Sequence, residues 1–235
     1  MTFTLPKKRL IIVSMSKITY PNIVLIGFMG TGKSAVADYL SGELGIPIID
    51  IDQMISESEN KSITDIFATD GEAYFRGLES SVLSQLANRV EGGSKPLYSP
   101  REGRFACARA GFTPAPARLG KYSHYAPLCI EKSTIISCGG GIVMTSGNIE
   151  KLKEIGCVVL LTASPQTIFT RVEKNDERPL LDGRMNKEFI TELLERRSWH
   201  YQRAADIVID TDGKSIPQVG EELLERMRRR QDYVW

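Results

Sequence analysis

The chain has 235 residues, of which 42% are hydrophobic, enough apolar material for a core in one domain with additions or in two small domains. Lys and Arg number 30 against 29 Asp and Glu, so the net charge of +1 gives no general argument for a nucleic-acid or anionic-membrane partner. The four cysteines form no C-x-x-C pair, and no apolar run approaches membrane-spanning length. These features predict free thiols in a reducing compartment and a cytoplasmic location.

Residues 1–20 precede the first expected strand and are interpreted as an N-terminal extension. Its stretch 7–14 is basic and then apolar, but the apolar part is too short for a secretory signal. Met15 stands shortly before the strand. Both Met1 and Met15 therefore stay open as the natural start.

The strongest motif lies at residues 27–34. The apolar, β-branched run 23–26 before it predicts a strand buried on both faces. Gly27-Phe-Met-Gly-Thr-Gly-Lys-Ser34 fits the phosphate-loop pattern G-x-x-x-x-G-K-[ST], and residues 35–44 continue with helical spacing. Glycines let backbone N–H groups turn toward a phosphate, Lys33 can reach the β- and γ-phosphates, and the Ser34 hydroxyl can hold Mg²⁺. A plain glycine turn is disfavoured because strand, loop and helix follow in order.

Residues 45–52 predict a second strand that ends in two carboxylates. Period two places Asp50 and Asp52 on the same side of this strand, at the end where doubly wound sheets bind ligands. One interpretation puts one carboxylate near Mg²⁺ and the other near a substrate hydroxyl. The other interpretation is that Asp52 caps a helix starting at Gln53. The upstream phosphate loop favours the functional interpretation.

A capped short helix is expected at 62–67 and a longer helix at 72–89. On the longer helix Arg76 and Glu79 are three residues apart and share a face. They form either an ordinary surface ion pair or an arginine held in place to grip a substrate carboxylate. The residues alone leave both open.

The stretch 92–130 has a different composition from its surroundings. It contains five of the 11 prolines, shows no sustained period, and carries six basic residues against one acidic residue. A loop of this length is unusual inside a compact domain, so a flexible insertion is expected, with 21–91 and 131–235 forming a single domain that carries the phosphate loop. A zinc site and a nucleic-acid arm are disfavoured, because the Cys and His spacing is unusual and most basic loops are only solvated.

The remaining chain alternates strands and helices. Three glycines at 139–141 follow a strand and would permit close approach of a ligand to the backbone. The polar segment 175–183 is interpreted as a flap in which Arg178 could cover phosphates, or as a solvated loop. Strands are expected at 133–138, 157–162 and 206–210, and helices at 147–155, from Pro165 after a Ser164 cap, at 186–201 and from Ser215.

Five short strands that alternate with helices predict an α/β fold with a five-stranded parallel sheet and helices on both faces. In such a sheet the ligand crevice lies at the carboxyl ends of the strands. The phosphate loop, Asp50, Asp52 and residues 139–141 are expected to converge there.

Six motifs also occur in a fixed order. They are Gly27–Ser34, Asp50-Ile-Asp52, Phe67-x-x-x-Gly-Glu-x-x-Phe-Arg-x-x-Glu79, Gly139–Gly141, Arg178-Pro-Leu-Leu181 and Arg197-x-x-x-Tyr201. This set resembles the shikimate kinase family, small phosphate-loop kinases of the nucleoside-monophosphate-kinase type. The resemblance covers about residues 22–91 and 132–230.

The resemblance implies an ATP- and Mg²⁺-dependent kinase that converts shikimate into 3-phosphoshikimate, releasing ADP, in the biosynthesis of chorismate and aromatic amino acids. It implies a monomer without nucleic-acid or membrane partners. Asp52, Lys33 and Arg178 would act in catalysis, with Asp52 accepting the proton of the attacking hydroxyl. The substrate site would comprise Asp52, Arg76, Gly139, Gly140, Gly141, Arg197, Phe67 and Phe75. The nucleotide site would comprise Gly30, Thr31, Gly32, Lys33, Ser34, Ala35, Arg171 on adenine, Arg178 and Lys214, and Ser34 and Asp50 would hold Mg²⁺.

One departure concerns the long link between the Arg76 helix and the strand before Gly139, which is short in family members. Two alternatives are kept: a related kinase with another acceptor, such as gluconate, and an ATP-binding protein that has lost catalysis. The intact motif residues argue against the second.

Overall fold

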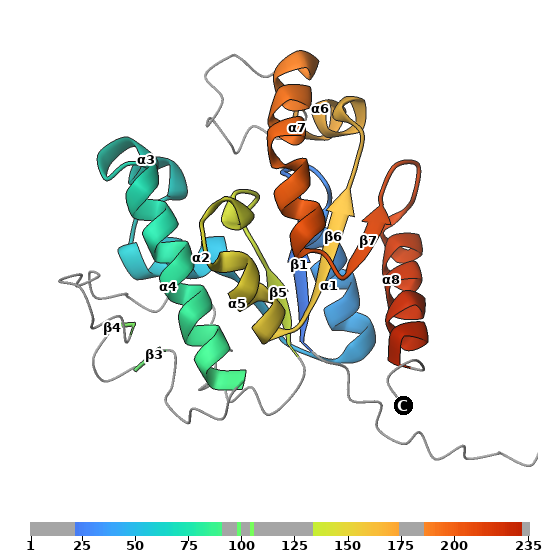
Figure 1. Cartoon of the computed structure of the whole chain (residues 1–235), viewed down its shortest axis with the longest axis horizontal. Helices are drawn as coiled ribbons and strands as arrows, with labels where there is room; N and C mark the ends of the chain where they lie inside the picture. Colours follow the sequence, from blue (N-terminus) through green and yellow to red (C-terminus); the bar gives the residue numbers. More distant parts are fainter. Residues whose placement is uncertain (1–21, 91–97, 100–103, 106–133, 174–185, 232–235) are drawn as a thin grey trace, which may run out of the picture.

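The structure, a computed structural model, describes residues 22–90, 98–99, 104–105, 134–173 and 186–231. Its main sheet has five parallel strands in the order β2-β5-β1-β6-β7. This confirms the predicted α/β fold with a five-stranded parallel sheet. The succession β5-β1-β6-β7 can be followed in Figure 1. The strands are β1 (Ile23–Ile26), β2 (Ile48–Asp50), β5 (Ile135–Ser137), β6 (Cys157–Thr162) and β7 (Ile207–Asp210).

The sheet order places β1 at the centre. Leu25 pairs with Ser137 of β5 on one side and with Val159 of β6 on the other. Because parallel strands all end at the same edge, the segment that follows β1 lies between the segments that follow β5 and β6. The phosphate loop therefore occupies the middle of that edge.

Helices cover both faces of the sheet, and the alternation along β1 explains how. Ile23 and Leu25 pack with the helices α1 and α8, whereas Val24 and Ile26 pack with α2, α4, α5 and α7. All four β1 side chains are fully buried, as expected for a central strand of a sheet that is covered by helices on both faces. The helices are α1 (Lys33–Leu44), α2 (Ile51–Glu59), α3 (Ile63–Thr69), α4 (Glu72–Val90), η1 (Ile142–Met144), α5 (Asn148–Ile155), α6 (Pro165–Glu173), α7 (Lys187–Ala204) and α8 (Ile216–Gln231).

The predicted helix starts are confirmed at three polar caps. Ser62, Ser164 and Asn186 each accept a hydrogen bond from the backbone N–H three residues later, at 3.0, 3.2 and 2.8 Å. Such a bond satisfies one of the donors that the first turn of a helix leaves open. Local sequence was sufficient here because donor and acceptor are neighbours in the chain.

Several expected elements differ from the structure. The second strand ends at Asp50 rather than at residue 52, and the single 3₁₀ turn η1 was not expected. Within the stretch 92–130, two-residue strands β3 (Tyr98–Ser99) and β4 (Arg104–Phe105) pair antiparallel, so this part has some regular structure. The remainder of that stretch, the extension 1–20 and the flap with Arg178 lie outside the described residues, and the domain boundaries stay predictions.

Two composition-based expectations touch the described residues. No helix among them is long and apolar enough to cross a membrane. Cys138 and Cys157 are free thiols, in agreement with the expectation, while the other two cysteines lie outside the described part.

Candidate active site

The phosphate loop runs from β1 into α1 with a backbone that only glycine adopts readily. Gly27, Gly30 and Gly32 have φ angles of 141°, 75° and 93°. A Cβ on Gly27 would collide with the carbonyl oxygen of Leu161 on β6. Gly32 is the N-cap of α1 and has no side chain to cap it. The N-terminus of α1, with the positive end of the helix dipole, therefore stays open toward the loop.

The side chains of the loop hold it together. The ammonium of Lys33 donates to the carbonyl oxygens of Gly27 and Phe28 at 2.8 and 3.0 Å. The buried Thr31 hydroxyl also donates to Phe28 O, at 2.8 Å. The Lys33 side chain is thus folded back over the loop, and its charge lies beside the loop backbone. Ser34 follows it in the first turn of α1.

The two carboxylates after β2 have different positions from those predicted. Asp50 is the N-cap of α2, and its side chain accepts from Gln53 N at 3.0 Å. The helix begins at Ile51, so Asp52 lies in its first turn, and strand alternation does not relate the two residues. The prediction that Asp52 caps a helix starting at Gln53 is wrong as well, because Asp50 takes that place. Because both residues belong to the start of α2, both carboxylates still lie at the carboxyl end of the strands.

The carboxylates and the phosphate loop share one cavity. Its volume is about 450 Å³, and an adjoining hollow of about 740 Å³ shares Ser34, Asp50, Asp52 and Ser137 with it. The predicted convergence at the carboxyl ends of the strands is confirmed for the phosphate loop, Asp50, Asp52, Gly139 and Gly140, whereas Gly141 is not among the lining residues. The smaller cavity is lined by Met29, Gly30, Gly32, Lys33, Ser34, Ala35, Asp50, Asp52, Ser137, Cys138, Gly139, Gly140, Arg171 and Val172.

Arg76 on α4 is held by two carboxylates. Its Nη1 is 2.6 Å from Oε2 of the fully buried Glu79, and its Nη2 is 2.9 Å from Oε1 of the exposed Glu72. The guanidinium also lies 5.4 Å from the centre of the Phe75 ring, which packs against Phe67 at 4.9 Å. The ordinary surface ion pair is therefore excluded, because Glu79 has no exposed surface.

Glu79 links this cluster to Asp52. A Cβ on Gly139 would lie 2.5 Å from Asp52 Oδ1 and 2.9 Å from Glu79 Oε1, so both carboxylates approach the same backbone atom. Burial raises the pKa of Glu79 to about 7, and Asp52 adds to the rise while Arg76 opposes it. Only glycine at 139 leaves room for the two carboxylates.

We expect the stability of the protein to depend on pH through Glu79. Its folded pKa is raised above the ordinary 4.5, so its contribution is full below pH 4.5 and is lost as pH rises through about 7. Over that window the free energy of unfolding should fall by roughly 3 kcal/mol. Urea unfolding between pH 4.5 and 8 should show this slope, and Glu79→Gln should flatten it. Glu72→Gln removes the exposed partner of Arg76 and should keep the slope; equal flattening by both variants would contradict the assignment.

Residues 139–141 are tied to α7. The carbonyl oxygen of Gly140 accepts from the Tyr201 hydroxyl and from Arg197 Nη1, the latter at 3.3 Å. Arg197 also lies 5.4 Å from the ring centre of Phe28 in the phosphate loop. A Cβ on Gly141 would collide with the Arg76 guanidinium. The turn therefore lies between the two predicted arginines, Arg76 and Arg197.

The residues predicted near adenine lie on the other side of the phosphate loop. Arg171 donates to the carbonyl of Gly30 at 3.1 Å and to the hydroxyl and carbonyl of Thr211, both at 3.0 Å. Lys214, in the loop after β7, forms an ion pair with Glu222 at 2.7 Å. Arg171 lines the cavity, whereas Lys214 is not among its lining residues.

Comparison with known proteins agrees with this geometry. The profile of the shikimate kinase family matches residues 29–93 and 124–228. The chain belongs to the shikimate kinase family. A shikimate kinase from Persephonella marina is 37% identical over 207 residues, covering 88% of this chain and 99% of that protein. One from Bacillus cytotoxicus is 34% identical over 87% of this chain and 97% of that protein.

Solved shikimate kinases share the fold. That of Aquifex aeolicus has a TM-score of 0.60 and 27% identity, covering 90% of this chain and 99% of the other. That of Acinetobacter baumannii, solved in complex with shikimate, has a TM-score of 0.68 and 24% identity over 92% and 97% of the two chains.

The donor set of the cavity fits Mg²⁺ carried by a nucleotide. Among the described residues no group of three or more His, Cys, Asp or Glu could hold a metal. Ser34 and Asp50 nevertheless bring oxygen donors to the same cavity wall. Mg²⁺ keeps several waters and takes one or two protein oxygens besides phosphates, so two donors are sufficient.

Sequence reasoning missed three contacts in the site. Tyr201 was part of a motif but had no assigned role, and its bond to Gly140 spans 61 positions. Thr211 connects Arg171 to the end of β7, and its place directly after a strand was the only signal available. Phe28 was assigned no role besides its place in the loop, although it contacts Arg197. Arg178 lies outside the described residues.

Proposed function

We propose that the protein transfers the γ-phosphoryl group of ATP to the 3-hydroxyl of shikimate, giving 3-phosphoshikimate and ADP. The observation that carries the proposal is one cavity that joins a phosphate loop to Asp52, with an arginine paired to a fully buried carboxylate beside it. Membership of the shikimate kinase family supports the choice of acceptor.

Asp52 acts on the attacking hydroxyl. Its carboxylate accepts the hydroxyl proton while the shikimate oxygen forms a bond to the γ-phosphorus. The bond from that phosphorus to the oxygen bridging the β-phosphate breaks, and ADP leaves. Phosphoryl transfer needs little covalent help from the protein, so Asp52 serves mainly to align the nucleophile. Its place in the first turn of α2, beside the loop, supports this role.

Two arginines bind the shikimate carboxylate. Arg76 is oriented by Glu79 and Glu72, and Arg197 approaches from α7 across the turn 139–141. Guanidinium groups match a carboxylate with paired hydrogen bonds. Phe67 and Phe75 provide an apolar wall for the ring, and backbone N–H groups of residues 139–141 face the substrate.

Backbone N–H groups of residues 30–35 bind the phosphates, and Lys33 leaves its carbonyl partners to reach them. Mg²⁺, held by Ser34 and through water by Asp50, would neutralise charge on the β- and γ-phosphates. Arg171 uses its in-plane donors on Gly30 and Thr211, which leaves its flat face for adenine. We place Lys214 beside the adenine base of the nucleotide. We place Arg178 over the phosphates of the nucleotide, where it closes the site.

We further propose that the protein is a cytoplasmic monomer in the biosynthesis of chorismate and aromatic amino acids, without nucleic-acid or membrane partners. The near balance of 30 basic and 29 acidic residues supports the absence of a polyanionic partner.

Coupled ADP release from the full chain with ATP and Mg²⁺ tests the reaction. Shikimate should stimulate turnover by several orders of magnitude over water as acceptor, and gluconate at the same concentration should not. Stimulation by gluconate alone would identify a kinase with another acceptor. ATP binding without any acceptor-dependent ADP release would identify a protein that has lost catalysis.

A further inference from the structure

A third hollow lies outside the active site, between η1, the start of α5 and the last two turns of α7. Its volume is about 430 Å³, within the roughly 300–1,000 Å³ typical of small-molecule sites. It shares no lining residue with the two cavities described above. It is lined by Val143, Met144, Thr145, Ser146, Gly147, Ile149, Glu150, Trp199, His200 and Arg203.

Two large apolar side chains of this hollow are exposed. Trp199 is 59% exposed and Met144 is 41% exposed, and Val208 alone joins them among the large exposed hydrophobics of the described residues. They come from different elements, α7 and η1, and face one hollow. Exposed Trp and Met on a concave surface are suited to an aromatic ring, since both make favourable contacts with a π face.

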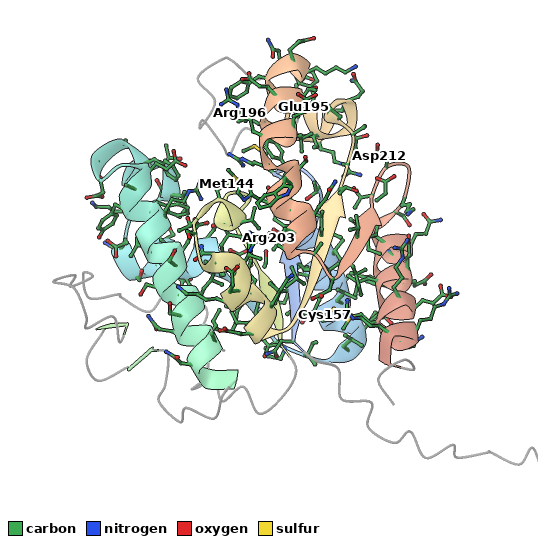
Figure 2. The ribbon with its side chains drawn as sticks, viewed as in Figure 1. Met144, Cys157, Glu195, Arg196, Arg203 and Asp212 are labelled. Carbon is green, nitrogen blue, oxygen red and sulfur yellow. The ribbon has the colours of Figure 1, made fainter. Side chains whose placement is uncertain are left out.

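A pair of opposite charges borders the same hollow. Arg203 on α7 contacts Glu150 on α5 at 3.2 Å, and both side chains are more than half exposed. Figure 2 shows Arg203 on α7 and Met144 on η1 on the same side of the molecule. An exposed pair of this kind contributes little, so both groups retain the capacity to bind a ligand that carries both charges. Arg203 also lies 5.4 Å from the Trp199 ring centre, which places charge beside the aromatic surface.

The start of α5 adds hydrogen-bond donors. Its N-cap is Gly147, with φ of 81° and no side-chain cap. Asn148 N donates to Thr145 O at 3.2 Å, so the donors available to a ligand are those of the rest of the first turn. Such an end favours a carboxylate. Together with Arg203 it forms a subsite that binds an anion, and Glu150, which lies in the same first turn, forms a subsite that binds a cation.

We propose that this hollow binds an aromatic α-amino acid, with its carboxylate on Arg203 and the start of α5, its ammonium on Glu150, and its ring against Trp199 and Met144. The net charge of the two charged wall residues is zero, which matches a zwitterion better than a simple anion or cation. We expect the ligand to carry an aromatic ring because Trp199 and Met144 expose apolar surface to the hollow.

The hollow is connected to the turn that contacts Arg197. Along α7, Tyr201 stands between Trp199 and Arg203 in the sequence. The hydroxyl of Tyr201 donates to Gly140 O. On the other wall, Gly141 is the N-cap of η1, and Met144 N donates to Gly141 O at 2.9 Å. A ligand that bridges α7 and η1 therefore acts on both sides of residues 139–141. We expect it to change the KM for shikimate about two- to fivefold, a coupling that rests on the proposed function.

Direct binding tests the site. Trp199 and Trp235 are the two tryptophans, so in the Trp235→Phe chain the fluorescence reports on Trp199 alone. Titration with L-phenylalanine should change this fluorescence saturably, and calorimetry should give the same Kd. 3-Phenylpropionate lacks the ammonium and phenethylamine lacks the carboxylate, so each should bind about tenfold more weakly. Equal binding of the three compounds would overturn the zwitterion assignment.

Variants locate the binding. Trp199→Ala and Arg203→Ala should each weaken L-phenylalanine binding at least about tenfold by calorimetry. Arg196→Ala is the matched control, because Arg196 lies on the same helix in an exposed pair with Glu192 at 2.6 Å and lines no part of the hollow. Absence of binding at 10 mM ligand, or binding that survives both variants, overturns the proposal. Binding without any change in the KM for shikimate overturns the coupling alone, and binding by a chain without shikimate turnover refutes only the proposed function.

Discussion

Asp52→Asn should lower kcat for shikimate phosphorylation by about 10²- to 10⁴-fold, the usual contribution of a positioned general base. Asparagine keeps the shape of the side chain, but it loses the charged acceptor that aligns the hydroxyl and it cannot take the hydroxyl proton. Asp52 lines the cavity with Lys33, and its Oδ1 lies beside Gly139. The loss should therefore appear in kcat, with the KM for ATP nearly unchanged.

Asp38→Asn is the control for this measurement. Asp38 lies on α1 and lines only the adjoining hollow, so its replacement removes one negative charge nearby without touching the proposed base. Steady-state ADP release should show wild-type kcat for this variant. A kcat for Asp52→Asn within about threefold of wild type would contradict the role, since alignment and proton acceptance together exceed that factor.

Arg76→Ala should affect substrate binding and stability together. Loss of a charged hydrogen-bonding partner for the shikimate carboxylate should raise KM by about 10- to 100-fold. The same change leaves Glu79 buried without its cation, which should lower the free energy of unfolding by about 3 kcal/mol or more at pH 8. At pH 5.5 the stability loss should be smaller, because Glu79 then takes a proton instead of staying charged. Urea unfolding at the two pH values measures the second effect.

A double variant separates the two effects of Arg76. Arg76→Ala/Glu79→Gln removes both charges of this pair, so stability should recover while the KM for shikimate stays high. Arg196→Ala, which breaks only an exposed pair with Glu192, should leave both quantities near wild type. Recovery of KM in the double variant would show that Arg76 acts through the fold and does not bind the carboxylate.

The sequence was most informative where neighbours in the chain determine the outcome. The phosphate loop could be read completely, because its conformation needs glycine at fixed positions and its helix starts immediately after it. The caps at Ser62, Ser164 and Asn186 were predictable for the same reason. The prediction that Asp50 and Asp52 lie on the same side of a strand was wrong. Alternation of side chains holds only within a strand, and Asp50 is already the N-cap of α2.

Contacts between distant segments were not predictable in this way. Glu79 could be paired with Arg76 from their spacing, but its complete burial and its approach to Asp52 depend on how α4 packs on α2 and on the turn 139–141. Tyr201 and Thr211 became part of the site only through the positions of α7 and β7. The hollow between η1, α5 and α7 had no signature in the sequence at all, since its walls come from two stretches about fifty residues apart.

The sequence by itself determined the parallel α/β sheet, the phosphate loop and the family, because alternation, glycine placement and ordered motifs are local properties of the chain. Only the tertiary structure decided that Asp52 and Glu79 share one space beside Gly139, and that α7 contacts both the glycine turn and the third hollow. These features depend on burial, and burial is set by the packing of all the helices on the sheet at once.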